Sequence, residues 1–331
     1  LIGREGRVPK EQTTGFLEVL RDLAGDMGEW AIYAVLAMLV LTLWKKFPYR
    51  TWRILHKAMP VLYLMLAFHA ALLAPLTYWL EPAGVLLAVL LVAGVYGAIR
   101  SLLGSIGRSR EATGRIVAIE HPSNEVTTVR CQLERGWRGH QAGQFAFVTF
   151  EDREGAHPFT IASANHGDNT VTFQIKALGD YTGALAQRLH PGQTVRVEGP
   201  YGRFDLQRRN PKARQIWIAG GIGVTPFLAW LESLQAHPEQ APAAELHYCT
   251  RDQDGDAFVP RLQALCAKLP SVQLHIHGAR QGATLKAAAL QGAQKAEIWF
   301  CGPSGLANSL REGLRALGAR PHFHQEAFEM R

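Results

Sequence analysis

Cysteine is scarce in this sequence of 331 residues, and its spacing is irregular. The four cysteines, Cys131, Cys249, Cys266 and Cys301, are scattered without any paired spacing. The sequence therefore indicates neither a disulfide framework nor a Cys-x-x-Cys metal site, and it favours a reducing compartment.

Acidic residues are almost absent from residues 31–103, where Glu81 is the only one. Outside one basic loop, nearly every residue of this region is apolar. Three runs, Ala31–Trp44, Val61–Leu80 and Ala83–Ile99, approach the ~20 residues that a helix needs to cross a bilayer. We therefore expect a partial bundle of three transmembrane helices within residues 30–104, surrounded by membrane lipid.

The net charge of +7 has a simple explanation in membrane topology, so we expect no nucleic-acid partner. Basic residues flank the apolar runs on one side only, and the positive-inside rule places that side in the cytoplasm. We expect an integral membrane protein, of a bacterial inner membrane, whose soluble half is cytoplasmic. The flanking basic residues are Lys45, Lys46, Arg50, Arg53, Lys57, Arg100, Arg108, Arg110 and Arg115.

The first 29 residues are polar and contain several glycines, so we predict a loop outside the cytoplasm over residues 1–29. Within it, Phe16–Leu23 has the pattern of a short amphipathic helix. The chain starts at Leu1 without a signal-peptide pattern, and its membrane part looks incomplete. We therefore expect that helices upstream of Leu1 are missing.

Two histidines lie in the second apolar segment, His56 at its cytoplasmic mouth and His69 deeper. On one helix their spacing corresponds to ~20 Å of rise, enough to attach two haems stacked across a bilayer. They would point ~140° apart, so the haems need different partner helices or a distortion, for which Pro60 is available. We predict that both bind haem iron; the alternative is that they are packing histidines.

The soluble half begins with a pattern typical of an antiparallel β-barrel over residues 105–205. Thr113–Glu120 and Glu125–Leu133 alternate like two strands joined by a turn, and Gln144–Phe150 supplies another. The stretch His157–Ser163 would end a strand at the mouth of the barrel. Thr194–Glu198 would close the barrel.

A helix is expected to begin after Gly179, following a strand over Val171–Lys176. Its free backbone N–H groups, together with the Thr182 hydroxyl, suit a pyrophosphate. Lys176 would assist an anionic cofactor, although solvated surface charge explains it equally well.

Residues 206–331 change to an α/β pattern with two glycine-rich turns, Ala219–Pro226 and Phe300–Gly305. Three successive strand–helix units indicate a doubly wound nucleotide-binding domain. Glycine is expected in these turns because a Cβ would keep phosphate or nicotinamide from the backbone. The histidines at 275, 277, 322 and 324 alternate along expected strands, and no carboxylate at ligand spacing completes a metal site there.

Four motifs, His157-Pro158-Phe159-Thr160, Gly179-Asp180-Tyr181-Thr182, Gly220 to Phe227 and Cys301-Gly302-Pro303, together resemble those of the ferric reductase and NADPH oxidase superfamily. The resemblance covers most of the chain. It implies a ferredoxin-reductase-like module that binds FAD and NADPH or NADH, attached to membrane helices that hold haem b.

The resemblance also implies roles for single residues. Pro158, Phe159, Thr160 and Ser163 would contact the flavin, with His157 and Thr182 towards its phosphates. Gly220, Gly221, Gly223, Thr225, Pro226, Gly302 and Pro303 would form the nucleotide site, and the catalytic Cys301 would lie near the nicotinamide. The family has six membrane helices, whereas only the last three are expected here, and some members end in a stacking aromatic, whereas Arg331 ends this chain.

Two further residues carry expectations about the nucleotide. Arg251 lies where the second strand of the domain should end, so its guanidinium is expected to bind the 2′-phosphate of NADPH. The alternative is a surface arginine paired with Asp252, Asp254 or Asp256. Phe328, in an expected C-terminal strand, is predicted to cover the flavin ring until nicotinamide displaces it.

Together these features predict transmembrane electron transfer from cytoplasmic NAD(P)H through FAD and b-type haems to an acceptor such as ferric iron. One alternative is an NADPH oxidase that makes superoxide from oxygen. Another is a membrane-anchored flavin reductase that serves a cytoplasmic redox protein. A haem-binding membrane subunit with an inactive nucleotide half is the third.

Overall fold

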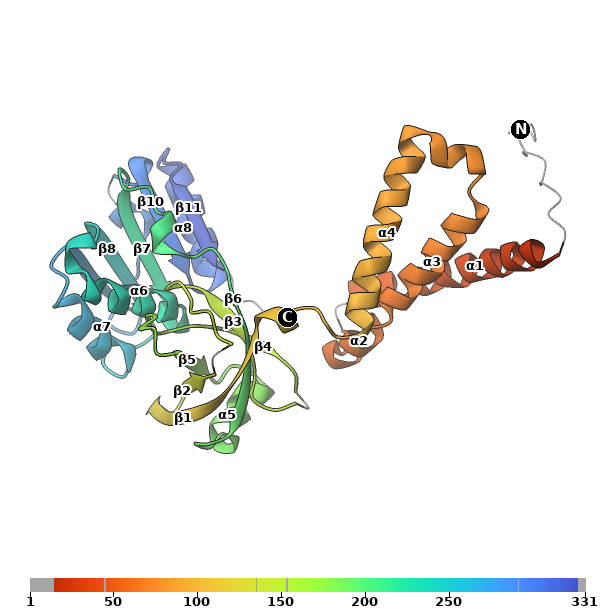
Figure 1. Cartoon of the computed structure of the whole chain (residues 1–331). Helices are drawn as coiled ribbons and strands as arrows, with labels where there is room; N and C mark the ends of the chain where they lie inside the picture. Colours follow the sequence, from red (N-terminus) through yellow and green to blue (C-terminus); the bar gives the residue numbers. More distant parts are fainter. Residues whose placement is uncertain (1–14, 45, 135, 153, 291, 327–331) are drawn as a thin grey trace. The chain divides into compact units, whose positions relative to one another are not determined.

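The computed structural model describes residues 15–44, 46–134, 136–152, 154–290 and 292–326. The chain divides into two compact units, with the division between Ile106 and Gly107. The first unit is helical, and the second contains two β-sheets with their helices (Figure 1).

Three stretches of the first unit, Phe16–Leu43, Ile54–Leu73 and Pro82–Leu102, are long and apolar enough to cross a membrane. Most of their side chains are exposed within the unit. The third predicted segment, Ala83–Ile99, is helical almost as expected. The first, Ala31–Trp44, belongs to a longer helix, and the second, Val61–Leu80, is divided between an α-helix and a short 3₁₀ helix. The helices are α1 (Phe16–Leu43), α2 (Tyr49–His56), α3 (Met59–Leu73) and α4 (Pro82–Leu102), with a short 3₁₀ helix, η1 (Leu76–Leu80).

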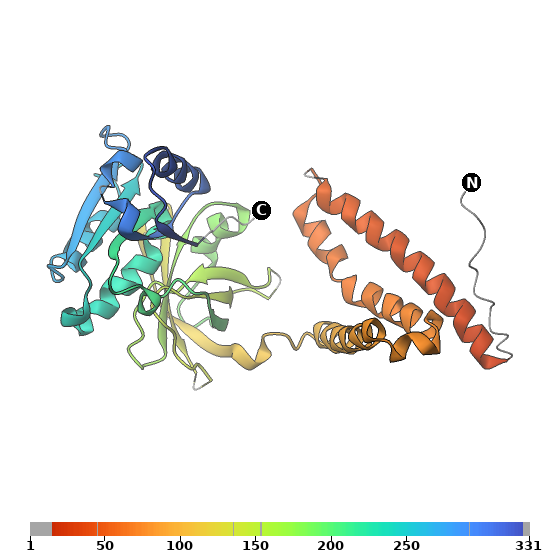
Figure 2. The same cartoon turned by 90° about the horizontal axis from the view of Figure 1, so that it is seen from above.

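Helix α1 begins at Phe16, so the prediction of a loop over residues 1–29 is wrong from that residue onward; residues 1–14 lie outside the described part. One glycine of this region, Gly28, serves packing instead. Ala24, Gly28 and Ala31 are the buried residues of α1, and their spacing puts three small side chains on one face. Helices α1 and α3 pack side by side, because small residues allow close approach (Figure 2).

The segment with the two histidines is not one continuous helix. His56 ends α2, a turn follows at Lys57 and Ala58, and α3 begins at Met59 with Pro60 in its first turn. Proline is tolerated there because the first N–H groups of a helix have no intrahelical partner. The separation of ~20 Å and ~140° expected for a single helix therefore does not apply to His56 and His69.

The first sheet of the second unit is antiparallel, with strand order β4-β3-β6-β1-β2-β5. A bridge between Ile161 and Phe173 brings its two edges together, as expected for a barrel. The predicted strands and the turn after β1 are confirmed. The elements are β1 (Glu111–Ser123), β2 (Val126–Leu133), β3 (Phe145–Thr149), β4 (His157–Thr160), β5 (Thr170–Lys176), α5 (Asp180–Arg188) and β6 (Thr194–Tyr201).

The second sheet is parallel, with strand order β11-β10-β7-β8-β9, which confirms the doubly wound prediction. Chain order reverses between the adjacent strands β7 and β10. Ligands bind such sheets beyond the carboxyl ends of the strands at this point. The elements are β7 (Arg214–Gly220), α6 (Thr225–Ala236), β8 (Ala244–Thr250), α7 (Phe258–Cys266), β9 (Val272–Gly278), β10 (Ala296–Cys301), α8 (Ser304–Ala316) and β11 (His322–Glu326).

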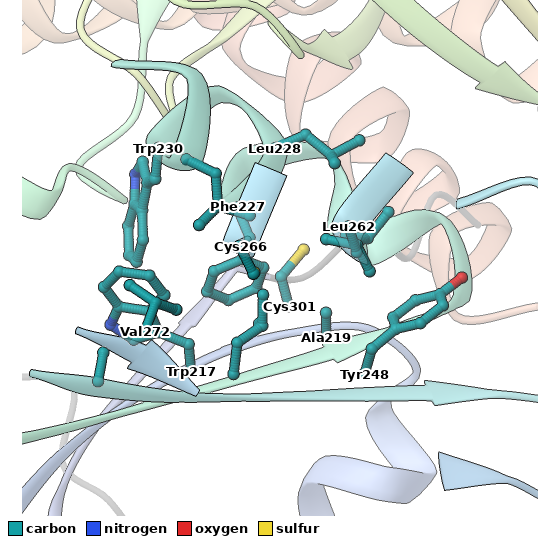
Figure 3. Close-up of a cluster of buried hydrophobic side chains, with 14 of the residues drawn as sticks. Trp217, Ala219, Phe227, Leu228, Trp230, Tyr248, Leu262, Cys266, Val272 and Cys301 are labelled. Atoms are coloured by element: carbon teal, nitrogen blue, oxygen red, sulfur yellow. The ribbon is translucent and has the colours of Figure 1, made fainter. Parts of the chain in front are cut away.

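Helices cover both faces of this sheet (Figure 1). Helices α6 and α7 pack on the face that carries Trp217 and Trp299, and α8 packs on the face that carries Ile216 and Ile298. The tryptophan cluster continues into the barrel domain, because Phe204, just after β6, stacks on Trp230 with ring centroids 5.0 Å apart. The two sheet domains therefore share one apolar cluster, several of whose nucleotide-domain side chains are drawn in Figure 3.

Candidate functional site

Two glycine turns meet at the carboxyl ends of β7 and β10, where chain order reverses. Residues 220–223 leave β7, and residues 302–303 leave β10. The two turns pack backbone against backbone: a Cβ added to Gly223 would lie 2.3 Å from the Cys301 carbonyl oxygen, and one on Gly220 would lie 2.7 Å from Pro303 Cδ. These glycines are thus required by the contact between the turns, which was not the reason expected from sequence.

Gly221 differs from its neighbours. It has a φ of 55°, in the left-handed region that favours glycine, and a Cβ there would meet nothing within 4 Å. The open space in front of Gly221 is where a ligand can approach the backbone. Among these glycines, Gly221 best fits the predicted role at a nucleotide.

A cavity of about 710 Å³ opens at these turns and is lined by both sheet domains. The barrel contributes the turn between β1 and β2 and the end of β5, so a ligand here touches both domains. Seven of the predicted cofactor-binding residues line it: Lys176, Gly220, Gly221, Gly223, Arg251, Gly302 and Pro303. The cavity places these residues together, although they come from distant parts of the sequence.

The acidic side chains on the cavity wall are engaged by neighbours, which leaves Arg251 for an anionic ligand. Asp252 accepts from Arg280 at 2.7 Å, and Asp256 accepts from the Tyr248 hydroxyl at 2.8 Å. Arg251 forms no ion pair with a carboxylate of the described residues. The alternative in which Asp252 neutralises Arg251 is therefore not what this geometry shows.

Lys176 and Thr182 both have partners within the barrel domain. Lys176 Nζ lies 3.2 Å from Glu125 Oε2, so its charge is shared with a neighbouring carboxylate. The Thr182 hydroxyl oxygen accepts from the backbone N–H groups of Leu178 and Gly179, at 3.0 and 3.2 Å. Thr182 thus caps α5 and holds the turn before it.

Strand β4 carries the predicted flavin residues on two faces. Phe159 lies in the barrel core, and His157 stacks on Tyr181 with ring centroids 4.2 Å apart. The hydroxyls of Thr160 and Tyr181 are buried and have no hydrogen-bond partner in the described part of the chain. Buried hydroxyls normally find partners. A polar cofactor bound along β4 and α5 would supply them, so these residues fit FAD.

Ser163, Thr225 and Pro226 do not line the large cavity. The Ser163 hydroxyl accepts from the Thr172 backbone N–H at 3.1 Å, and the Thr225 hydroxyl donates to the Ile222 carbonyl at 3.1 Å. Pro226 is buried in the first turn of α6. The visible role of all three is to hold the local chain, and cofactor contacts by them remain a prediction.

The Cys301 side chain lies in the apolar core with Ala219 and Phe227, and it does not line the cavity (Figure 3). Burial raises the pKa of the Cys301 thiol well above its ordinary range, and the nearby Glu326 carboxylate adds to this. The thiol is therefore protonated and is not a nucleophile. A catalytic role for Cys301 at the nicotinamide remains a prediction, and Phe328 lies outside the described residues.

Glu326 is a candidate functional residue that the sequence did not reveal. It pairs with Cys301 in the β10–β11 register, and its Oε2 is buried without a hydrogen-bond partner among the residues described. Burial raises the pKa of this carboxyl to about 7. A buried carboxyl with a perturbed pKa has the profile of a functional group. The signal available in sequence was one acid at the end of a strand, which is too common to stand out.

In the helical unit, His69 Nδ1 donates to the Ala24 carbonyl oxygen at 2.8 Å. Because a carbonyl only accepts, this bond fixes the tautomer and leaves Nε2 of the neutral ring with a free lone pair. His56 stacks on Trp52 with ring centroids 4.6 Å apart. The two histidines lie on different helices, and no third histidine joins them in the helical unit as described.

Known proteins are similar in sequence to the barrel domain and the nucleotide domain of this chain. The family model of the FAD-binding domain matches residues 113–205. Vanillate O-demethylase oxidoreductase of a Pseudomonas species is 32% identical over 148 residues, which are 44% of this chain and 45% of that protein. NADPH oxidoreductase of Mycobacterium tuberculosis is 26% identical over 242 residues, covering 69% and 62%. The carnitine monooxygenase reductase subunit of Escherichia coli is 27% identical over 188 residues, covering 54% and 56%.

The fold is also that of solved flavoproteins. A ferredoxin NADP⁺ reductase from Neisseria gonorrhoeae, with bound FAD and NADP, superposes with a TM-score of 0.56 at 17% identity. The superposed part makes up 66% of this chain and 98% of the reductase chain. The chain spans only about half of the first curated relatives it matches.

These matches show a ferredoxin-reductase-like module with an FAD-binding barrel and an NAD(P)H-binding domain. They support the prediction of an NAD(P)H-dependent flavin oxidoreductase. They give no support to haem, to ferric iron as acceptor, or to membership of the ferric reductase and NADPH oxidase superfamily. The family match begins at residue 113, so it does not reach the apolar helices.

Proposed function

We propose that the chain is a flavin reductase, anchored to a membrane by α1, α3 and α4, that passes electrons from NAD(P)H to a separate redox protein. The cavity at the meeting of β7 and β10 carries this proposal, because its walls come from both the flavin-binding barrel and the nucleotide domain. A nucleotide held there lies against the domain that holds the flavin. Relatives named as an oxidoreductase and a reductase subunit of demethylase and monooxygenase systems support a protein acceptor.

The chain's own residues would bind and orient the two cofactors. The Gly221 turn, at the start of a helix-forming segment, offers backbone N–H groups to a pyrophosphate. Arg251 would hold a 2′-phosphate, and the Thr160 and Tyr181 hydroxyls would donate to FAD. Bound FAD would accept two electrons as a hydride and release them one at a time.

The helices support the membrane anchor. Leu39, Val40 and Leu43 on α1, and Val89 and Val92 on α4, are exposed apolar side chains. Contiguous exposed apolar surface on helices of this length is typical of lipid contact. The flanking basic residues support a cytoplasmic position for the flavin module, where NAD(P)H would be available.

The test uses the full chain, loaded with FAD in detergent micelles. NADPH added without oxygen should bleach the flavin absorbance, and cytochrome c added afterwards should be reduced. The proposal is wrong if bound flavin is not reduced by either NADPH or NADH. Rapid superoxide formation in air that outpaces reduction of any protein acceptor would favour the oxidase alternative.

One observation favours a second candidate function, electron transfer through haem b across the membrane. A carbonyl fixes the Nδ1–H of His69 and leaves Nε2 as the ring atom that can face a metal, which is how protein histidines are prepared for a metal. His56 lies nearer the basic, cytoplasmic end of the same segment. Each haem would still need a second axial ligand from another helix or chain.

A reduced-minus-oxidised spectrum of the full chain in membranes, after NADPH is added, tests this second function. We expect His56→Ala to abolish haem reduction, because it removes the carrier next to FAD. His69→Ala should leave an inner haem reducible and stop transfer to the far side. If both variants keep the haem content and spectrum of the wild type, the histidines only pack the helices, and the anchored reductase remains.

A further inference from the structure

A histidine pair and a carboxylate meet at the amino ends of β10 and β11, the opposite end of the sheet from the glycine turns. The parallel register places Glu297 beside His322 and Trp299 beside His324. Because side chains alternate along a strand, all four lie on one face. Glu297 and Cys301 are separated by four residues of strand, a distance of ~13 Å, so this group is remote from the cavity.

Three ligand atoms converge there. Glu297 Oε1 lies 2.8 Å from His324 Nε2, which lies 2.9 Å from His322 Nδ1. The third side, from His322 Nδ1 to Glu297 Oε1, is 3.8 Å. All three are atoms that coordinate metals.

Two neutral imidazoles cannot make both short contacts of His324 Nε2 as hydrogen bonds. If His324 Nε2 carries a proton and donates to Glu297, it has no lone pair for His322 Nδ1. If His324 Nε2 instead accepts from His322, no hydrogen lies between this nitrogen and the Glu297 oxygen 2.8 Å away. Lone pairs of the nitrogen and the oxygen then face each other. A cation between the three atoms removes the conflict, since each atom then presents a lone pair to it.

The ligands are held in place by a second layer of contacts. Glu297 Oε2 accepts from the Asn210 backbone N–H at 2.7 Å and from Gln215 Nε2 at 3.0 Å. Its other oxygen is thereby directed at the histidines. The His324 ring stacks on Trp299 with centroids 3.8 Å apart and planes 15° apart. Such supporting contacts orient ligands and are typical of real metal sites.

We propose that Glu297, His322 and His324 bind one divalent transition metal ion of the zinc class. A metal held at ~2.1 Å in tetrahedral geometry separates its ligands by ~3.4 Å, which lies within the observed range of separations. Two imidazoles exclude Ca²⁺ and Mg²⁺, which prefer oxygen ligands. The His322 side chain is 76% exposed, so water would complete the coordination.

A second cluster in the same domain is a weaker candidate. Glu245, His247 and His275 also approach one another, but Glu245 already pairs with the Arg214 guanidinium. That positive charge opposes a second cation. The second cluster therefore provides a matched control.

The metal would join β11 to β10 and, through the contacts of Glu297 with Asn210 and Gln215, to β7 and the chain just before it. Its role is to fix the last strand of the sheet, independently of the proposed electron transfer. Binding should raise the melting temperature, because the ion binds the folded domain and not the unfolded chain.

The experiment uses the FAD-loaded full chain, purified without a histidine tag and stripped with chelator. Zn²⁺ is titrated calorimetrically, and Co²⁺ is used as a coloured probe of coordination. The wild type should bind one Zn²⁺ that is lost or weakened at least tenfold in His322→Asn, and its Co²⁺ bands should disappear. His322 is exposed, so this variant should fold, which its flavin content verifies.

His275→Asn, an exposed histidine of the second cluster, should leave Zn²⁺ affinity unchanged. Equal affinity and stoichiometry in wild type and His322→Asn would overturn the proposal. Loss of binding in His275→Asn alone would overturn it as well, because the site would then lie on β8 and β9. Neither outcome bears on the reductase activity, which is measured separately.

Discussion

At the scale of single residues, we expect Arg251 to decide which nicotinamide cofactor is preferred. Its guanidinium lines the cavity while the neighbouring Asp252 is engaged by Arg280. Arg251→Ala should raise KM for NADPH about tenfold or more, the value of a charge-assisted phosphate contact, and leave NADH little changed. Steady-state kinetics with both cofactors measures this, with the exposed Arg315→Ala as control. An equal effect on NADPH and NADH would refute the assignment.

Glu326 should impose a pH dependence on stability. Its folded-state pKa of about 7 lies above the ordinary value of 4.5, so the folded protein binds the proton more tightly than the unfolded chain. The contribution of Glu326 to the free energy of unfolding is therefore greatest below pH 4.5, and this contribution falls as the pH rises to about 7. Over this range the free energy of unfolding decreases by up to about 3 kcal/mol.

Glu326→Gln keeps the shape and removes the charge, so it should flatten this dependence and stabilise the protein above pH 7. Denaturant midpoints of wild type and variant, on both sides of the window, provide the measurement. Parallel pH profiles for the two proteins would show that Glu326 is solvated and unimportant for stability.

The sequence could reveal residues whose role is local, and it missed those whose role depends on distant partners. Arg251 was placed correctly because it follows a strand with a strong apolar pattern. The metal-binding group was not foreseen, because Glu297 reaches His322 only through pairing of strands separated by α8. The packing contact of Gly223 was not foreseen either, since the Cys301 carbonyl that excludes its Cβ belongs to another turn.

At the scale of elements, Gly223 and Gly221 offer a matched pair in one turn. Gly223→Ala places a Cβ 2.3 Å from the Cys301 carbonyl oxygen, so the turns after β7 and β10 must separate. We expect NADPH affinity to fall at least tenfold. Gly221→Ala meets no protein atom and costs about 1 kcal/mol of backbone strain, but its Cβ enters the space where the nucleotide approaches, so it should weaken NADPH binding without separating the turns. NADPH titration of flavin-loaded protein compares them; similar binding by Gly223→Ala and wild type would count against this role.

Packing of α1 on α3 should depend on one glycine. A Cβ at Gly28 would lie 2.0 Å from His69 Nδ1, so Gly28→Ala should displace the ring and break its bond to Ala24. Gly25, three residues earlier, has open space, and Gly25→Ala should stabilise the helix by about 1 kcal/mol. Thermal unfolding of the full chain in detergent should rank Gly25→Ala above wild type and Gly28→Ala lowest. The reverse order would contradict the observed packing.

Most strands and helices followed from local pattern, whereas helix ends in the apolar unit did not. The β1–β2 hairpin and the β7, β8 and β10 strands carry periodicity and turn residues that act over a few positions. The part of α1 before residue 30 includes small residues, Ala24 and Gly28, that pack in the unit, and the break after His56 precedes a helix whose second residue is Pro60. Such ends are set by packing, which a single segment does not encode.

At the scale of the whole molecule, the distribution of basic residues predicts which side of a membrane each end occupies. Leu80, between α3 and α4, is 85% exposed and far in sequence from the basic residues; Ile106, after α4, is 63% exposed and lies beside them. In intact cells, Leu80→Cys should react with a membrane-impermeant maleimide, and Ile106→Cys only after permeabilisation. Equal labelling of both would rule out the proposed topology.

The order of strands in the parallel sheet has a consequence for synthesis on the ribosome. Strand β7 lies at the centre of the sheet, yet β10 pairs with it through residues such as Gln215 and Glu297, 82 positions apart. Until residue 301 has emerged, β7 has an unpaired edge, and such edges invite association with other chains. A stalled or truncated chain would therefore hold a finished flavin barrel beside an open nucleotide domain. Chaperone capture should be strongest for nascent chains that end between β9 and β10.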